Sequence, residues 1–184
     1  VRNVLVVRRT GQDVAWDGVS QGEICMRGPW ITRTYHGMTD EQLEGRFHEG
    51  YWRSGDVGTI DADGYLKVTD RLKDVIKSGG EWISSIDMEN RLLSHPAIAE
   101  AAVVGLPHPK WQERPFVVVV PHPGVEVTLE EVRTHLSDAF ASWQLPDAII
   151  IAAEIPRTSV GKFDKKSIRA KYAGAYTLTE TGNV

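Results

Sequence analysis

The stretch DRLKDVIKSGGEWISSIDMEN, residues 70–90, separates two parts of the sequence that differ in texture. Its first five residues are four charged residues and a leucine, which is typical of an exposed link between domains. The turn Ser78-Gly79-Gly80 follows, because paired glycines reach backbone conformations that other residues avoid. Ser84 or Ser85 can then cap a helix that continues to about Ser94. The stretch therefore predicts a linker, a turn and the first helix of a new domain.

Beyond residue 90, apolar runs alternate with helical patterns. The apolar runs predict buried strands at 101–106, 116–120 and 148–153. A capping box of Thr128 and Glu131 predicts the start of a second helix, and residues 164–172 predict a polar final helix. The residues expected on the apolar faces of the first two helices are Ile86, Met88, Leu92, Leu93, Leu129, Val132, Leu136 and Phe140. These patterns predict an α+β fold class, with a small sheet flanked by helices.

Upstream of the linker, short β-type runs are separated by turn signals. Strands are expected at 4–7 and 23–27, a short helix at 39–47, and a hairpin turn at Asp61-Ala62-Asp63-Gly64. This part lacks the apolar bulk for a core of its own. The chain also begins at Val1 and enters a strand-like run at once, which suggests a piece of something longer.

The predicted organisation has three parts. Residues 1–70 are expected to be the incomplete end of a larger domain, residues 71–173 a compact α+β domain, and residues 174–184 a flexible tail.

Composition excludes several classes of protein. The net charge of −4 implies no basic face, so nucleic acid is not expected as a partner. The longest aliphatic run, Val117 to Val120, is too short for a transmembrane segment. The single cysteine, Cys25, excludes an internal disulfide and fits a cytoplasmic location. It is expected to be a small core residue of its strand.

A first candidate site lies in YWRSGDVG, residues 51–58. A carboxylate on a glycine-flanked turn, such as that of Asp56, can accept two hydrogen bonds from the cis-diol of a ribose. The alternative is a hairpin turn in which Asp56 bonds only the backbone.

Two further candidates follow in the chain. Gly79 and Gly80 allow the backbone to approach a ligand closely, although an ordinary turn after a solvated linker has the same pattern. In PRTSVGKF, residues 156–163, Lys162 can place a point charge against a developing anion, or it can be an exposed lysine of a surface turn. Pro156 and Phe163 exclude a phosphate loop, which requires Gly and Ser or Thr at those positions.

The remaining reactive residue types indicate no metal centre. His95, His108 and His122 each precede a proline, and no pair of histidines has metal-ligand spacing, so structural or surface roles are expected. Trp111 and Trp143 are expected to be packing anchors rather than ligand platforms.

Taken together and in order, these segments resemble the adenylate-forming superfamily of acyl-CoA synthetases, peptide-synthetase adenylation domains and beetle luciferases. GEICMRGPWITRTYHG with YWRSGDVG is similar to the end of that family's large N-terminal domain. DRLKDVIKSGGEWISSIDMEN is similar to its hinge, and PRTSVGKFDKK to its closing lysine motif. GGEWISS and HPKWQERP look most like the medium- or long-chain fatty-acid–CoA ligase branch.

The resemblance implies a two-step reaction in which ATP and a fatty acid form acyl-AMP and the thiol of CoA then displaces AMP. It implies that Asp56 and Arg71 bind the ribose and that Lys73 is the hinge. It also implies that Gly79, Gly80 and Glu81 line the pantetheine route and that Lys162 is catalytic in the first step. The partners that the resemblance implies are ATP/AMP, CoA, a fatty acid and the missing N-terminal domain.

Mg²⁺ is expected with ATP, and no residue of this chain is identified as its ligand. The phosphate loop, adenine-binding stretch and acyl pocket of the family are not found here, so the chain is expected to be inactive alone and the acyl chain length is left open. Two alternatives remain: an adenylation domain that loads a carrier protein, and a non-catalytic interaction domain of the same fold. A luciferase-like oxidation has no support in these residues.

Overall fold

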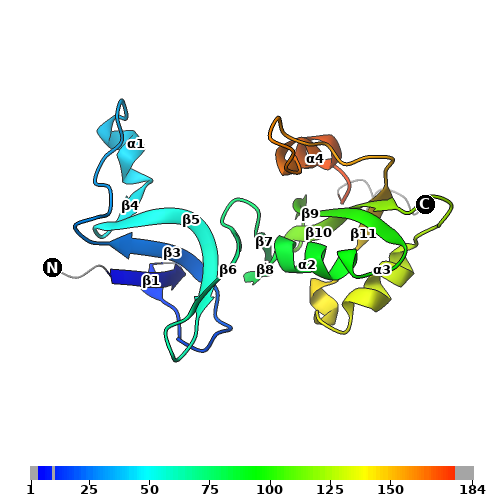
Figure 1. Ribbon diagram of the computed structural model, residues 1–184, viewed down its shortest axis with the longest axis horizontal. Helices are drawn as coiled ribbons and strands as arrows, with labels where there is room; N and C mark the ends of the chain where they lie inside the picture. The colour runs from blue at the N-terminus through cyan, green and yellow to red at the C-terminus, as the bar shows by residue number, and fades with distance from the viewer. Residues whose placement is uncertain (1–3, 10, 177–184) are drawn as a thin grey trace. The chain divides into compact units, whose positions relative to one another are not determined.

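The computed structural model describes residues 4–9 and 11–176, with the side chains of Val4 and Leu5 left out. The contacts between residues divide the chain into two compact units, one on each side of the Lys73–Asp74 bond. Figure 1 shows strands dominating the first unit, and strands with flanking helices in the second. No helix among the described residues is long and apolar enough to cross a membrane.

The first unit contains an antiparallel sheet. Its strand order is β2-β1-β3-β5-β4, and β6 also pairs with β5. The elements are β1 (Val4–Arg9), β2 (Gln12–Asp13), β3 (Gly22–Arg27), α1 (Asp40–Glu44), β4 (Phe47–His48), β5 (Tyr51–Ile60) and β6 (Leu66–Arg71). The long strand β5 is therefore the element that joins β3, β4 and β6 into one sheet.

Local sequence explains the turns of this unit. The Asp61 carboxylate accepts hydrogen bonds from the backbone N–H groups of Asp63 (3.0 Å) and Tyr65 (2.8 Å), and Gly64 adopts a φ of 85°. The predicted hairpin turn is thus confirmed. So is the short helix α1, which Thr39 caps. The described core cluster is small, with Val7, Ile24 and Ile60 buried together.

The second unit is a mixed α/β unit. Its sheet has the order β11-β10-β7-β8, with β9 also paired to β10, and only the β10–β11 pair is parallel. The elements are β7 (Ile76–Ser78), β8 (Glu81–Ile83), α2 (Ser85–Leu93), β9 (Ile98–His108), β10 (Gln112–Pro121), α3 (Leu129–Leu136), the 3₁₀ turn η1 (Ser142–Gln144), β11 (Ala148–Ile151) and α4 (Lys165–Tyr172).

Helices cover both faces of this sheet because alternate residues of β9 and β10 point to opposite sides. Val103 and Val117 pack in one buried cluster with residues of α2 and α3. Val104 and Phe116 pack in a second cluster that contains Ile168 of α4. The predicted sheet flanked by helices is confirmed, and so are the caps of α2 and α3, which are Ser84 and Thr128.

Several expectations about burial are wrong. The run 148–153 is not a buried strand, because β11 is the edge strand of the sheet and Ile151 is 49% exposed. Ile86 and Leu93 lie on the solvent side of α2, at 39% and 48% exposure. Phe140 lies beyond the end of α3, although it still packs against the core cluster that contains Val132 and Leu136 of that helix. In helices of only eight or nine residues, the spacing of apolar residues does not show how far the buried face extends.

The expected flexible tail is also corrected where the structure describes it. Tyr176 is only 5% exposed and packs in the buried cluster that contains Ile168 of α4. Its hydroxyl donates a hydrogen bond to the carbonyl of Pro115. Residues 177–184 lie outside the described part of the chain.

A buried arginine connects several segments of the second unit. Arg114 of β10 donates to both carboxylate oxygens of Asp147 (2.6 and 3.1 Å) and to the carbonyl oxygens of Trp143 and Leu145. Its Nη1 also lies 3.4 Å from the hydroxyl of Ser78. The guanidinium thus ties β7, η1 and the start of β11 to the central strand.

We expect Arg114→Met to destabilise the second unit by about 3 kcal/mol, because the buried carbonyl groups and Asp147 lose their donors. Arg91→Met is the matched control. Arg91 is 33% exposed, pairs with the exposed Asp138 and donates one hydrogen bond to the carbonyl of His135 (3.2 Å), so its removal should cost only about 1 kcal/mol. Urea unfolding of both variants measures the difference, and equal losses would contradict the structural role of Arg114.

Candidate functional site

The two residues predicted to bind a ribose lie side by side on neighbouring strands. Asp56 of β5 and Arg71 of β6 are directly opposed in the antiparallel pairing. Arg71 Nε lies 2.7 Å from Asp56 Oδ1, and both side chains keep access to solvent. This carboxylate therefore has one oxygen held by a cation while a polar ligand can still reach the pair.

A pocket of about 530 Å³ opens beside this pair. Its lining residues are Glu23, Gly45, Arg46, Arg53, Ser54, Gly55, Arg71, Leu72 and Lys73. Four of these carry a positive charge and one carries a negative charge. The excess of cations suits an anionic ligand.

Lys73 lies between two residues that are each tied to a different unit. The N–H of Leu72 donates to the carbonyl of Gly55 (2.8 Å), within the first unit. The carboxylate of Asp74 accepts from Arg169 of α4 (2.6 Å), within the second. A rotation of the backbone near Lys73 would therefore leave both ties in place.

The predicted glycine turn forms the tip of the β7–β8 hairpin. Gly79 and Gly80 have φ values of 59° and 85°, a region that disfavours residues with a Cβ. The N–H of Gly79 donates to the carbonyl of Trp111 (2.9 Å), and a Cβ on Gly79 would lie 3.3 Å from the Trp111 ring. The need for glycine here is therefore both conformational and steric.

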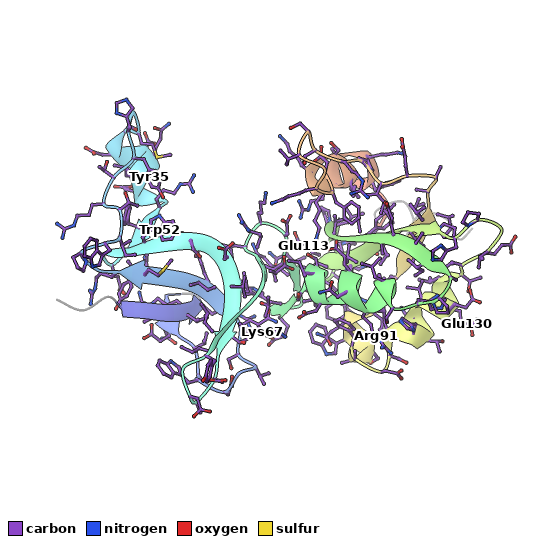
Figure 2. The ribbon with its side chains drawn as sticks, in the orientation of Figure 1. Tyr35, Trp52, Lys67, Arg91, Glu113 and Glu130 are labelled. Carbon is purple, nitrogen blue, oxygen red and sulfur yellow. The ribbon has the colours of Figure 1, made fainter. Side chains whose placement is uncertain are left out.

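Glu113 of β10 contacts the same β7–β8 hairpin through its carboxylate. Its carboxylate accepts a hydrogen bond from the N–H of Lys77 (2.8 Å), and Figure 2 shows its side chain beside β7.

In the first unit, Figure 2 labels Tyr35 and Trp52. The indole N–H of Trp52 donates a hydrogen bond of 2.6 Å to the hydroxyl of Tyr35, which ties the loop before α1 to β5.

A second pocket, of about 270 Å³, lies next to the glycine turn. Its lining residues are Ser78, Gly79, Glu81, Trp111, Arg114, Trp143 and Asp147. Trp111 and Trp143 are 41% and 45% exposed, so they are pocket walls rather than the packing anchors that were expected. Sequence reasoning missed Arg114, although a charge at the head of the run Phe116–Val120 was a signal that a buried partner existed.

Lys162 follows a tight turn that its neighbours hold in place. Thr158 N–H donates to the Lys162 carbonyl (2.7 Å), Gly161 N–H donates to the Thr158 carbonyl (2.9 Å), and Gly161 has a φ of 80°. Arg157 bonds the Gly161 carbonyl (2.9 Å) and pairs with Glu100 of β9 (2.7 Å). The Lys162 side chain is exposed and makes no ion pair within the described ranges.

The glycine turn and the Lys162 turn are attached at opposite ends of the β9–β10 hairpin. Trp111, which holds Gly79, lies in the connection after β9, whereas Glu100, which holds Arg157, lies near the start of that strand. From Glu100 to His108 a strand advances by about 26 Å. The two predicted functional segments thus have separate anchors on one rigid unit.

The arrangement of the other His, Cys, Asp and Glu side chains bears on metal binding and on the state of the single cysteine. No group of three His, Cys, Asp or Glu side chains suited to a metal occurs within residues 4–9 and 11–176. Cys25 is buried in β3 as expected, and burial raises the pKa of its thiol to about 11, so it stays protonated at neutral pH.

Comparisons with known proteins identify this arrangement. Residues 87–162 match the AMP-binding enzyme C-terminal domain. The chain is 52% identical over 172 residues to a long-chain-fatty-acid–CoA ligase of Thermus thermophilus, an alignment that covers 93% of this chain and 32% of that protein. The chain thus spans about a third of the length of this relative.

Solved structures agree with the sequence match. ATP-bound MatB from Rhodopseudomonas palustris superposes with a TM-score of 0.79 at 27% identity, over 95% of this chain and 35% of that one. An O-succinylbenzoate CoA synthetase (MenE) from Bacillus subtilis, in complex with ATP and magnesium, gives 0.75 at 30% identity, over 91% and 34%. The chain contains an AMP-binding enzyme C-terminal domain and is similar, over nearly its whole length, to the C-terminal third of acyl-CoA ligases.

Proposed function

We propose that this chain completes and closes the active site of an ATP-dependent fatty-acid–CoA ligase. In the first step the acid attacks the α-phosphate of ATP, giving acyl-AMP and pyrophosphate. In the second, the thiol of CoA attacks the acyl carbon and AMP leaves. The observation that carries the proposal is the pairing of Asp56 with Arg71 beside a cationic pocket, in a chain similar to CoA ligases throughout.

The ribose of ATP and of acyl-AMP is the ligand we assign to Asp56. The Asp56 carboxylate can accept hydrogen bonds from the two ribose hydroxyls, and the ion pair with Arg71 fixes its orientation. The neighbouring pocket carries the positive charge that a nucleotide requires. The phosphate groups and the adenine would be held by residues outside this chain.

Lys162 is the catalytic residue we assign to the first step. Two anions, a carboxylate and a phosphate, approach each other there, and a lysine fixed on a rigid turn lowers that repulsion without reorganising. Its exposure, and the hydrogen bonds that hold Thr158 and Gly161 around it, suit a side chain that meets its substrate only on closure.

The second step would use the β7–β8 hairpin instead. The bare backbone of Gly79 and Gly80, with Glu81 beside them, allows the narrow pantetheine arm of CoA to pass. Because this turn and the Lys162 turn have separate anchors, a swing about Lys73 would present them in succession.

Fatty acid, ATP and CoA are the substrates proposed, by similarity to the Thermus ligase. Mg²⁺ would arrive bound to the ATP phosphates, since the described residues contain no acidic cluster to hold it. The competing proposal is an adenylation domain that loads a carrier protein. Thioester formation with free CoA as the only thiol separates the two.

The chain alone should form no acyl-CoA and should bind AMP very weakly. Asp56 and Arg71 offer only a few hydrogen bonds, each contributing about 1 kcal/mol. Calorimetry with AMP and an assay of AMP release test this expectation. Robust turnover by the 184-residue chain would refute it.

Lys162→Ala in the complete ligase should slow acyl-AMP formation by about 10²–10³-fold, because the transition-state charge loses its counterion. Thioester formation from supplied acyl-AMP should stay near the wild-type rate. Lys166→Ala, which removes an exposed lysine of α4, is the control and should affect neither step. Equal losses in both half-reactions would contradict the assigned role.

Lys73→Pro should separate the two half-reactions in the opposite sense. Proline fixes φ near −65° and restricts the preceding residue, so one closed state should be trapped. We expect adenylation within about tenfold of the wild type and loss of thioester formation from acyl-AMP.

Lys73→Ala is the matched control, because it removes the side chain and keeps the backbone free. Because the Lys73 side chain lines the cationic pocket, its removal should raise the KM for ATP, but at saturating ATP both half-reactions should run near the wild-type rate. Melting curves should exclude unfolding in both variants. Small, equal losses in both steps for Lys73→Pro would mean that the pivot lies elsewhere.

A further inference from the structure

The pairing of β3 with β5 is interrupted beside Asp56. Glu23 pairs with Val57 and Cys25 pairs with Arg53, so Ile24 alone faces the three residues Ser54 to Asp56. The extra residues form a bulge, in which Gly55 has a φ of 75°. A bulge redirects a side chain out of the regular pleat, and here the redirected segment ends in the candidate ribose ligand.

A buried carboxylate spans this bulge. Glu23 is 7% exposed, and its Oε1 accepts the N–H of Gly55 (3.2 Å). Its Oε2 accepts from Nε and Nη2 of Arg53 (2.8 and 2.7 Å). Both carboxylate oxygens are therefore engaged at the bulge, from the opposite strand.

The same few residues are fixed from other directions. The carbonyl of Gly55 accepts from the N–H of Leu72, and the N–H of Asp56 donates to the hydroxyl of Ser54 (3.0 Å). Residues 54–56 have no paired partner on β3, and the Glu23 side chain supplies a hydrogen bond from that strand instead.

Stability alone is a poor explanation for this buried charge. Desolvating the Glu23 carboxylate costs free energy that its attraction to the part-exposed Arg53 does not reliably exceed, and an apolar residue at such a buried position often gives equal stability. A fixed direction for the bulge is what an apolar residue at position 23 could not provide, since it cannot accept the N–H of Gly55.

We propose that Glu23, at the wall of the cationic pocket, is a positioning residue for the nucleotide: it sets the direction of Asp56 through Gly55 and Arg53. This inference rests on the proposed role of Asp56 in binding the ribose. Ribose binding is shared by the ground state and the transition state, so its loss raises KM and spares kcat.

The test is Glu23→Gln in the complete ligase. Glutamine keeps the size of the side chain, but it removes the charge that holds Arg53. We expect KM for ATP to rise about tenfold while kcat changes by less than about threefold. KM for CoA should remain that of the wild type, because CoA does not contact the ribose carboxylate.

Two further variants serve as a control and as an intermediate case. Glu49→Gln is the matched control, since Glu49 also pairs with an arginine of this sheet (Arg8, 2.8 Å) but lies away from the bulge, and its KM for ATP should be unchanged. Glu23→Asp keeps the charge and shortens the reach, so its KM should lie between those of the wild type and Glu23→Gln. It also carries the test if Glu23→Gln does not fold.

The outcomes distinguish this inference from the function on which it rests. A wild-type KM for ATP in the Glu23 variants, with a raised KM in Asp56→Ala, overturns the positioning role alone. A wild-type KM in Asp56→Ala overturns the assignment of the ribose site. A fall in kcat with unchanged KM, together with a lower melting temperature, would make Glu23 merely structural and also overturns the inference.

Discussion

The antiparallel pairing of β9 with β10 is the constraint on which the second unit depends. Its register runs without interruption from Gln112 opposite His108 to Val120 opposite Glu100. Because neighbouring residues point to opposite faces, one hairpin supplies the apolar surface for both core clusters at once. The helices then have fixed places to pack, and the turns that carry Gly79 and Lys162 take their positions from the ends of the same hairpin.

Buried charges join segments of the second unit that are distant from one another in the sequence. Arg114 links the pocket beside the glycine turn to η1 and β11. Lys165 of α4 lies 2.9 Å from the carboxylate of Glu89 on α2, and that carboxylate also accepts the N–H of Val103. In such pairs one misplaced partner leaves a charge unsatisfied, so they define direction more sharply than apolar contacts do.

The two units offer complementary chemistry for the proposed reaction. The first has a cationic pocket beside an ion-paired carboxylate on two strands, which suits a nucleotide that stays bound through both steps. The second has two exposed turns with separate anchors, at Gly79 and at Lys162, which suits two steps that need different groups. A single residue between two tied neighbours, Leu72 and Asp74, is a natural place for the change of conformation between them.

The sequence by itself determined the elements whose signals are local. The caps at Ser84 and Thr128, the turn at Asp61–Gly64 and the glycine turn at Gly79–Gly80 all depend on residues close in the chain. The motifs around Asp56, Lys73 and Lys162 also indicated a resemblance to acyl-CoA ligases, and the comparisons agree, with a C-terminal domain match and 52% identity to a long-chain-fatty-acid–CoA ligase. Local hydrogen bonds and backbone preferences are encoded within a few residues, so a single sequence is enough to find them.

Tertiary structure alone decided which residues face solvent and which side chains meet across the fold. Ile151 is exposed because β11 is an edge strand, and the apolar composition of β11 does not show that it lies at the edge of the sheet. The contacts of Glu23 with Gly55 and of Arg114 with Asp147 join residues more than 30 positions apart. No local pattern in the sequence predicts contacts at such a separation. Such contacts form only when strands pair in one register, and that register is set by the free energy of the whole sheet.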